Sequence, residues 1–317
     1  LDSFLNEVQL SILFNHPNLL PIFRLESEPL RVELPKKSGG KRYYDHTAYF
    51  AVMQYIDGWN LRQVVNRLRS LNICLHPDIT MFIIARIARG LHYVHEYRDE
   101  NGEHLGLVHR DVSPENILID RFGRIKVADF GIAKSSKALR DDSFVNPGKM
   151  LYSSPEQLDG ATLDPRSDIF NVGLILYFLL TDNDRFGPEL GQTRARDRIR
   201  TKMRKPHLDD LQDVDSRVAK ICETCLAETP DKRYQTCEDL ATDIDIHFKN
   251  TQKIVGNEQL EEVLNELFKD KPSFQSRRFI ALTGSTRLEQ PGYDPASVGE
   301  AEHVAGPLPT VRMDEEE

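Results

Sequence analysis

The chain contains 317 residues, enough for one large domain or for two lobes around a cleft. Hydrophobic residues make up 39% of the sequence and charged residues 29%, the ordinary balance of a soluble globular protein. The formal net charge is -9, from 41 basic and 50 acidic residues, which argues against a nucleic-acid binder that works by bulk charge.

The N-terminal part predicts one helix followed by two strands. Apolar residues recur at helical spacing over residues 4–14, and the Asn-His-Pro-Asn that follows ends the helix. Residues 19–27 and 48–56 have the composition of strands. A long polar loop that contains Lys-Lys-Ser-Gly-Gly-Lys separates these two strands.

The rest of the chain predicts a mainly helical protein with a few short strands. The expected helices are 60–70, 78–97, a series up to about 250, and 257–270, and the expected strands are 107–109, 116–119 and 124–129. Proline, glycine, serine and acidic residues dominate from Pro272 onward, and such a composition predicts a disordered tail.

The apolar run and the cysteines point to a packed core. Residues 169–180 form the longest apolar run, shorter than the about 20 residues that span a bilayer, so a buried helix and no membrane segment are expected. Four cysteines are too few for a disulfide scaffold, which favours a reducing, cytoplasmic location. Cys222 and Cys225 lie in an amphipathic helical stretch and are expected in the core. Surface or capping positions are expected for three histidines, His92, His95 and His104.

Two carboxylates and one amide are candidates for binding divalent metal ions and for accepting a proton. Transfer of a phosphoryl group needs divalent metal ions that neutralise charge, and a carboxylate that orients the attacking hydroxyl or accepts its proton. Mg²⁺ prefers oxygen ligands. Asp111, Asn116 and Asp129 stand on loops around a predicted strand hairpin, where tight turns can aim all three side chains into one cleft.

These residues stand in motifs that resemble those of the eukaryotic-type protein kinases. His-Arg-Asp at 109–111 with Asn116 resembles the family's catalytic loop, and Asp-Phe-Gly at 129–131 resembles its metal-binding loop. The resemblance implies that Asp111 is the catalytic base and that Arg110 couples it to the activation segment. Asn116 and Asp129 are implied as metal ligands, with ATP and Mg²⁺ as cofactors.

Further matches follow in the family's order over about residues 1–250. Ser-Pro-Glu at 154–156 resembles the end of the activation segment. Asp168 falls where the family has the buried aspartate that holds the catalytic loop, and Arg233 where it has the partner of Glu156. The motifs are most similar to those of bacterial serine/threonine kinases.

The resemblance also implies the residues around the nucleotide. Met53 falls at the back of the adenine pocket, and Gln54 and Ile56 offer backbone groups to adenine. Asn60 falls where a ribose contact is expected. Glu7 falls where the regulatory helix carries the glutamate that pairs with the family's ATP-binding lysine.

Two departures from the family leave two readings open. No residue before Glu7 supplies the Gly-rich phosphate loop or the strand lysine, and the glycines of residues 36–42 have hairpin-loop composition. The chain is then a nearly inactive fragment of a longer kinase, or a pseudokinase that acts as a binding or scaffold module. The presence of Asp111, Asn116 and Asp129 favours the kinase, since a module without catalysis needs none of them.

The second departure concerns the catalytic loop. Serine/threonine kinases carry a lysine two residues after the catalytic aspartate, and this chain has Ser113 there. Lys149 stands where the family has an activation-segment threonine that meets that lysine. We hypothesise that Lys149 in the activation segment supplies the positive charge that the family's lysine supplies at the position of Ser113. A lysine ammonium can reach a phosphate on its long stem. The alternative is that Ser113 caps a turn and Lys149 is solvated.

The sequence therefore predicts an α+β, two-lobed protein kinase-like fold with an incomplete N-terminal lobe and a mainly helical C-terminal lobe. The expected parts are 1–56, the partial N-lobe; 57–250, the C-lobe; 251–271, a helical extension; and 272–317, an acidic tail. The expected activity is transfer of the ATP γ-phosphate to Ser or Thr hydroxyls, with protein substrates and ATP as partners and no nucleic acid.

Overall fold

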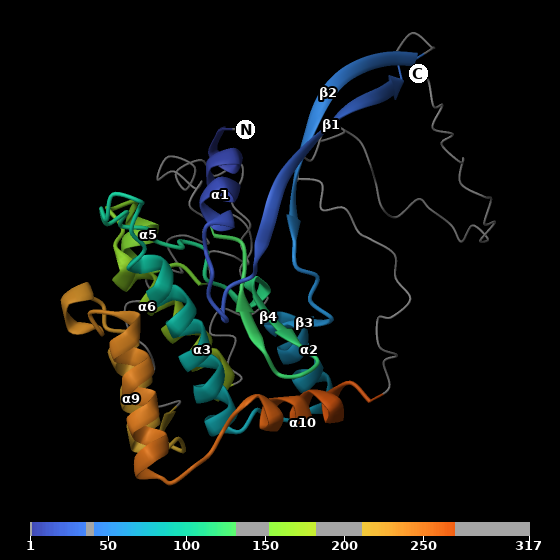
Figure 1. Ribbon diagram of the computed structural model, residues 1–317. Coiled ribbons are helices and arrows are strands. Elements are labelled where there is room, and N and C mark those ends of the chain that lie inside the picture. Colours follow the sequence, from blue (N-terminus) through green and yellow to red (C-terminus); the bar gives the residue numbers. More distant parts are fainter. Residues whose placement is uncertain (1, 36–40, 131–151, 182–210, 270–317) are drawn as a thin grey trace. The chain divides into compact units, whose positions relative to one another are not determined.

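The computed structural model describes residues 2–35, 41–130, 152–181 and 211–269 (Figure 1). Its N-terminal part consists of helix α1 (Asp2–Ile12) and a hairpin of β1 (Ile22–Pro35) and β2 (Lys41–Met53). The hairpin is antiparallel, and its register runs from Ile22 opposite Met53 to Pro35 opposite Lys41. Most of the predicted polar loop is therefore strand, and the side chains of residues 27–31 and 45–47 are exposed, as in a two-stranded ribbon open to solvent on both faces.

A second, three-stranded antiparallel sheet lies at the centre of the chain, in the order β3-β4-β5. Its strands are β3 (Gly58–Asn60), β4 (Ile117–Asp120) and β5 (Ile125–Val127). The strand predicted at 107–109 is absent from the described residues, since the amide of His109 binds a side chain instead of a neighbouring strand. Gly58 fits only as glycine, because a Cβ there would lie 2.0 Å from the carbonyl oxygen of Ile119.

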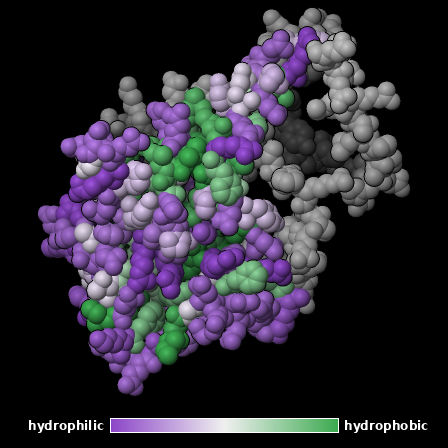
Figure 2. All heavy atoms as spheres, in the orientation of Figure 1, coloured by the Kyte–Doolittle hydropathy of each residue, from purple (hydrophilic) through white to green (hydrophobic). Residues whose placement is uncertain are grey.

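Helices account for more of the described residues than strands do. They are α2 (Leu61–Leu71), α3 (Pro77–His95), α5 (Pro155–Asp159), α6 (Pro165–Thr181), α8 (Ser216–Cys225), α9 (Cys237–Asn250) and α10 (Asn257–Leu267), with the short 3-10 turns η1 (Pro114–Asn116) and η6 (Pro230–Lys232). α3 packs against both α6 and α9 (Figure 1). On the face in Figure 2, hydrophilic residues cover most of the surface and hydrophobic residues show in narrower areas.

The interior confirms two predictions about the core. The apolar run of residues 169–180 lies in α6, which is buried along nearly its whole length. Cys222, Cys225 and Cys237 are buried, whereas Cys74 is exposed, and all four are free thiols. Burial raises the pKa of the Cys225 and Cys237 thiols well above the usual value, so these side chains are neutral packing groups. No described helix is long and apolar enough to cross a membrane.

The helical extension after residue 250 is part of the packed fold. α10 lies against α2 and buries three leucines, Leu260, Leu264 and Leu267. The division into parts at 56, 250 and 271 remains a prediction. The predicted disordered tail, 272–317, lies outside the described residues.

Candidate active site

The catalytic loop is held by one buried carboxylate at the start of α6. Asp168 is fully buried, and its oxygens accept hydrogen bonds from the backbone amides of His109 (2.7 Å) and Arg110 (2.9 Å). Burial acts to raise the pKa of Asp168, but the hydrogen bonds from His95 and from the backbone amide of His109 outweigh it and lower the pKa. Asp168 therefore stays ionised and fixes the loop, as the sequence predicted.

His95 is the third partner of this carboxylate, and its predicted surface or capping role is wrong. The side chain is buried at the end of α3, with Nε2 2.8 Å from Oδ2 of Asp168. His104, by contrast, is exposed, and its Nε2 lies 3.7 Å from Oε2 of Glu96. The three histidines look alike in sequence, but α3 is embedded among other helices, so its last turn places His95 inside the protein.

His109 orients the backbone of Asp111. Its Nδ1 accepts the backbone N–H of Asp111 (3.2 Å), which leaves Nε2 as the donor to the carbonyl oxygen of Ala128 (3.2 Å). Burial lowers the pKa of His109, so the ring is neutral in this arrangement. The imidazole thus joins the loop of Asp111 to the residue just before Asp129.

A change of pH tests that neutral state of His109. The folded protein holds its pKa below the unfolded value of 6.5, so its contribution to stability is present above that pH and is lost as the pH falls. We expect the free energy of unfolding to fall between pH 7 and pH 5, and His109→Gln to remove up to about 1.4 kcal/mol per pH unit of that slope. Urea titrations at several pH values measure it. His104→Gln is the control, and an equal loss of slope in both variants contradicts the assignment.

Asp111 and Asn116 lie together on the loop. The side-chain nitrogen of Asn116 donates to the backbone oxygen of Asp111 (2.8 Å) and to its Oδ2 (3.1 Å). Since both acceptors face the nitrogen, the Oδ1 of Asn116 is left as an oxygen that can bind a cation. The amide of Ala128 donates to the backbone oxygen of Asn116 (2.9 Å), which brings Asp129 next to this pair.

Strained backbone marks both ends of this arrangement. Arg110 and Asp129 have φ angles of 66° and 56°, in the left-handed region that residues other than glycine rarely adopt. Phe130, directly after Asp129, is buried with its ring 4.6 Å from that of His109 and 5.3 Å from that of Phe14. The packed ring fixes the turn and leaves the Asp129 side chain exposed beside the loop.

The donor set fits Mg²⁺ better than a softer metal. Asp111, Asn116 and Asp129 offer only oxygens, and hard cations such as Mg²⁺ take one or two carboxylates and complete their shell with phosphate oxygens and water. In the described part of the chain, no group of three or more His, Cys, Asp and Glu side chains could hold a metal by itself. A metal at this site would complete its shell with water or with the phosphate oxygens of a bound nucleotide.

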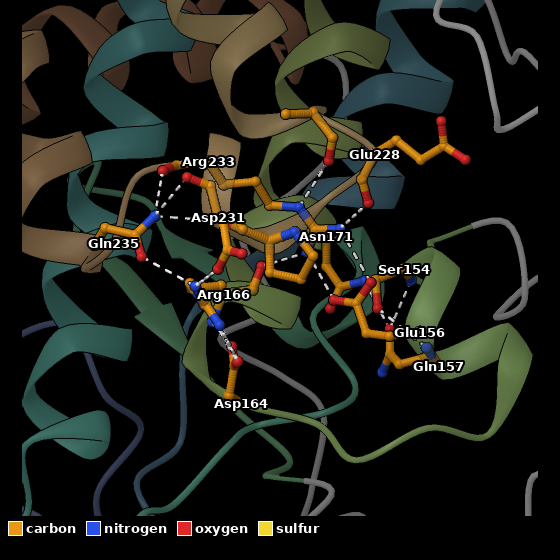
Figure 3. Close-up of polar contacts among 12 residues, drawn as sticks. Ser154, Glu156, Gln157, Asp164, Arg166, Asn171, Glu228, Asp231, Arg233 and Gln235 are labelled. Atoms are coloured by element: carbon orange, nitrogen blue, oxygen red, sulfur yellow. Dashed lines mark hydrogen bonds and ion pairs between the residues drawn. The ribbon is translucent and has the colours of Figure 1, made fainter.

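Sequence reasoning missed Gln157, which ties the end of the activation segment to the loop. Its Nε2 donates to the carbonyl oxygen of Arg110 (2.8 Å), while its Oε1 accepts from Ser154 N (2.7 Å) and Asn171 Nδ2 (3.0 Å). Figure 3 shows Gln157 near Ser154 and Asn171 at the start of α5. A Ser-x-x-Gln capping box is the sequence signal that could have revealed the helix start, though not the bond to Arg110.

The predicted pair of Glu156 and Arg233 is confirmed. Nη1 and Nη2 of Arg233 donate to the two carboxylate oxygens of Glu156 at 2.6 and 3.0 Å, the two-pronged geometry that suits guanidinium (Figure 3). The carbonyl oxygens of three further residues also accept from Arg233: Ala227, Arg166 and Glu228. Burial acts to raise the pKa of Glu156, and the contacts with Arg233 outweigh it and lower the pKa.

Arg62 is a second missed residue, on α2. Its Nε donates to Glu115, the residue before Asn116 (2.9 Å), and its Nη2 donates to the hydroxyl of Tyr152 (2.8 Å). Its guanidinium carbon also lies 5.3 Å from the ring centre of Phe178. Arg62 therefore connects α2, the catalytic loop and the described end of the activation segment.

The predicted nucleotide residues lie between the end of β2 and the end of β3. Met53 ends β2, and the amide of Gln54 donates to the carbonyl oxygen of Pro21 (2.9 Å), so the carbonyl of Gln54 is the group left for a ligand. Ile56 follows in the irregular segment before β3. The side-chain oxygen of Asn60 accepts the amide of Gln63 (2.9 Å) and caps α2, which leaves its nitrogen for a sugar hydroxyl.

Three other predicted residues lie in different settings. Glu7 is half-buried on α1, where its carbonyl oxygen accepts the hydroxyl of Ser11 (2.7 Å). Ser113 is buried, makes no side-chain cap to η1, and its hydroxyl has no hydrogen-bond partner among the described residues. The capping alternative for Ser113 is therefore not supported. Lys149 lies outside the described residues.

Comparison with known proteins identifies the family. The serine/threonine-protein kinase PknB of Mycolicibacterium smegmatis is 31% identical over 251 residues, 76% of this chain and 35% of PknB. The serine/threonine-protein kinase PrkC of Bacillus subtilis is 30% identical over 247 residues, 77% of this chain and 33% of PrkC. The tyrosine-protein kinase MasK of Myxococcus xanthus is 29% identical over 241 residues, 76% of this chain and 34% of MasK. The chain thus spans about a third of the length of these relatives.

A solved structure shows the same fold. The PknI kinase domain of Mycobacterium tuberculosis superimposes with a TM-score of 0.51 at 21% identity, over 77% of both chains. The fold is the mixed α/β kinase fold with a mainly helical later half, as predicted. Residues 2–243 match the protein kinase domain. With the loop of Asp111 anchored on Asp168 and Glu156 paired with Arg233, the chain belongs to the protein kinase family.

Proposed function

We propose that this protein transfers the γ-phosphoryl group of ATP to Ser and Thr hydroxyls of protein substrates. The observation that carries the proposal is the Asn116 side chain, whose nitrogen donates two hydrogen bonds to Asp111 and whose oxygen is then left for a cation. Asp111 is the base that accepts the proton of the attacking hydroxyl. Arg110 links that base to the activation segment through its carbonyl bond to Gln157.

The cofactors follow from the same residues. Asn116 and Asp129 are the proposed ligands of Mg²⁺, which neutralises charge on the phosphates when it is bound. The adenine lies against Met53 and meets the carbonyl of Gln54 and the backbone of Ile56. Asn60 donates to the ribose from its free side-chain nitrogen. ATP and protein substrates are the proposed partners, and a reducing, cytoplasmic compartment suits the free thiols.

The transfer also requires a Gly-rich loop and a lysine that pairs with Glu7. No residue before Glu7 supplies them, so we propose that they lie on sequence ahead of Leu1. Intact mass and N-terminal peptides of the protein isolated from its source test this point. If the native chain starts at Leu1, the active-kinase proposal is contradicted, and the buried Ser113 in place of the phosphate-contacting lysine then favours a scaffold module without catalysis.

The decisive assay is phosphoryl transfer by the native protein. Incubation with labelled ATP, Mg²⁺ and a mixed protein substrate, followed by analysis of the phosphorylated amino acids, gives both the activity and the acceptor. Phosphoserine and phosphothreonine support the proposal. Phosphotyrosine alone indicates instead a tyrosine kinase, the class named for MasK. The absence of phosphoserine, phosphothreonine and phosphotyrosine supports the scaffold module.

Lys149→Ala tests the proposed exchange of the catalytic cation with Ser113. We expect kcat to fall by about 10²- to 10³-fold, the range for losing one group that stabilises transition-state charge, with little change in the KM for ATP. Steady-state kinetics of the native protein measure both constants. Lys205→Ala is the matched lysine control, and a Lys149→Ala variant with normal kcat contradicts the exchange.

A further inference from the structure

Residues 251–268, which we name the C-terminal strap, lie beyond the part of the chain that matches the kinase family. The strap is nevertheless built into the fold. Its leucines Leu260 and Leu264 are fully buried, and Arg67 on α2 donates from Nε to the carbonyl oxygen of Leu267 (2.7 Å). That bond satisfies a backbone oxygen at the end of α10, where helices leave such groups without a partner.

The start of the strap touches the turn between β4 and β5. Gly123 in this turn has a φ of 73°, and a Cβ there would lie 2.2 Å from the carbonyl oxygen of Asn257. The same turn holds the segment after Ile56, because the amide of Arg121 donates to the carbonyl oxygen of Asp57 (2.9 Å) and its guanidinium lies 3.3 Å from the Asp57 carboxylate. The strap thus braces the turn that holds the proposed adenine-binding segment.

The end of the strap meets the same segment directly. Phe268 stacks on Trp59 with ring centres 4.1 Å apart and planes at 8°. Trp59 lies on β3 between Gly58 and Asn60, only three residues after Ile56. The indole nitrogen is buried and has no hydrogen-bond partner within the described ranges, so stacking and packing alone orient the ring.

We propose that the strap positions the nucleotide site and sets its affinity, with Phe268 as the positioning residue. Phe268 and Asn257 act on residues 56–60 from two sides, through Trp59 and through the β4–β5 turn. Release of the strap loosens this segment and weakens nucleotide binding, while the catalytic loop stays anchored on Asp168. The inference rests on the proposed function, because that proposal places adenine at Ile56 and ribose at Asn60.

Trp59 is the only tryptophan of the chain, so its fluorescence reports the stack directly. We compare the wild type with Phe268→Leu in the whole chain, and use Phe248→Leu on α9 as the matched control. The measurements are Trp59 emission, MgADP affinity by calorimetry, and hydrogen exchange of the amides of residues 54–60. For Phe268→Leu we expect changed emission, faster exchange of these amides, and affinity lower by about three- to tenfold, the size of a lost aromatic pair.

Each outcome separates the strap from the proposed function. Unchanged exchange and unchanged MgADP affinity in Phe268→Leu overturn the inference and leave the proposed function intact. Equal effects in Phe268→Leu and Phe248→Leu also overturn it, since they reflect general loss of packing. A wild type that binds no MgADP contradicts the nucleotide site itself, and the exchange of residues 54–60 then decides whether the strap positions this segment.

Discussion

Asp111→Asn is expected to lower kcat of the native protein by about 10²- to 10⁴-fold, the range for losing a positioned general base. The amide has the shape of the carboxylate, and its oxygen still accepts the hydrogen bond from Asn116. The anchoring of the loop on Asp168 is independent of this side chain. The variant therefore folds normally and binds ATP, but it cannot take the proton from the attacking hydroxyl.

Kinetics and unfolding together check this expectation. kcat should fall while the KM for ATP and the urea midpoint stay close to the wild-type values. Asp213→Asn, the same change at an exposed position, should leave all three unchanged. An Asp111→Asn variant that keeps more than a tenth of the wild-type kcat is incompatible with Asp111 as the base.

The largest loss of stability is expected from Glu156→Gln. The side chain of Arg233 is completely buried, and Glu156 is the carboxylate that balances its charge. Removing one partner of a buried ion pair costs about 3–5 kcal/mol, because the other charge stays in a poorly solvating interior. We expect the free energy of unfolding, measured by urea titration, to fall by this amount.

A second substitution distinguishes the charge from the shape. Combining Glu156→Gln with Arg233→Met removes the uncompensated charge and should recover part of the lost stability. Asp231→Asn breaks an ion pair with Arg166 in which Asp231 is 89% exposed, and it should cost no more than about 1 kcal/mol. If Glu156→Gln is no more damaging than Asp231→Asn, the pair does not hold the fold.

The site residues that could be predicted are those that lie close together in sequence or stand in a short motif. Asp111 and Asn116 lie on one loop, and their distance in sequence fixes their distance in space. Asp168 and Arg233 were recognised because they stand in motifs of their own. The role of His95 could not be predicted, because it depends on how α3 is rotated among its neighbours, and that is set by packing along its whole length.

Contacts between distant segments carried no signal in the sequence. Nothing in the spacing links Arg62 to Tyr152, or Trp59 to Phe268, since each pair meets only after several helices have packed. The hairpin of β1 and β2 was underestimated for a different reason. Its charged residues have loop composition, but strands that are exposed on both faces carry the same residues.

The rate at which the cysteines react with a thiol reagent reports local opening of this protein. A thiol reagent reacts rapidly with the exposed Cys74. The buried thiols become accessible only when α8 and α9 separate from α6; they are Cys222, Cys225 and Cys237. The labelling rate of these three thiols therefore measures how often the helical half of the protein opens. Cys74, between α2 and α3, can carry a single dye without the removal of any native cysteine.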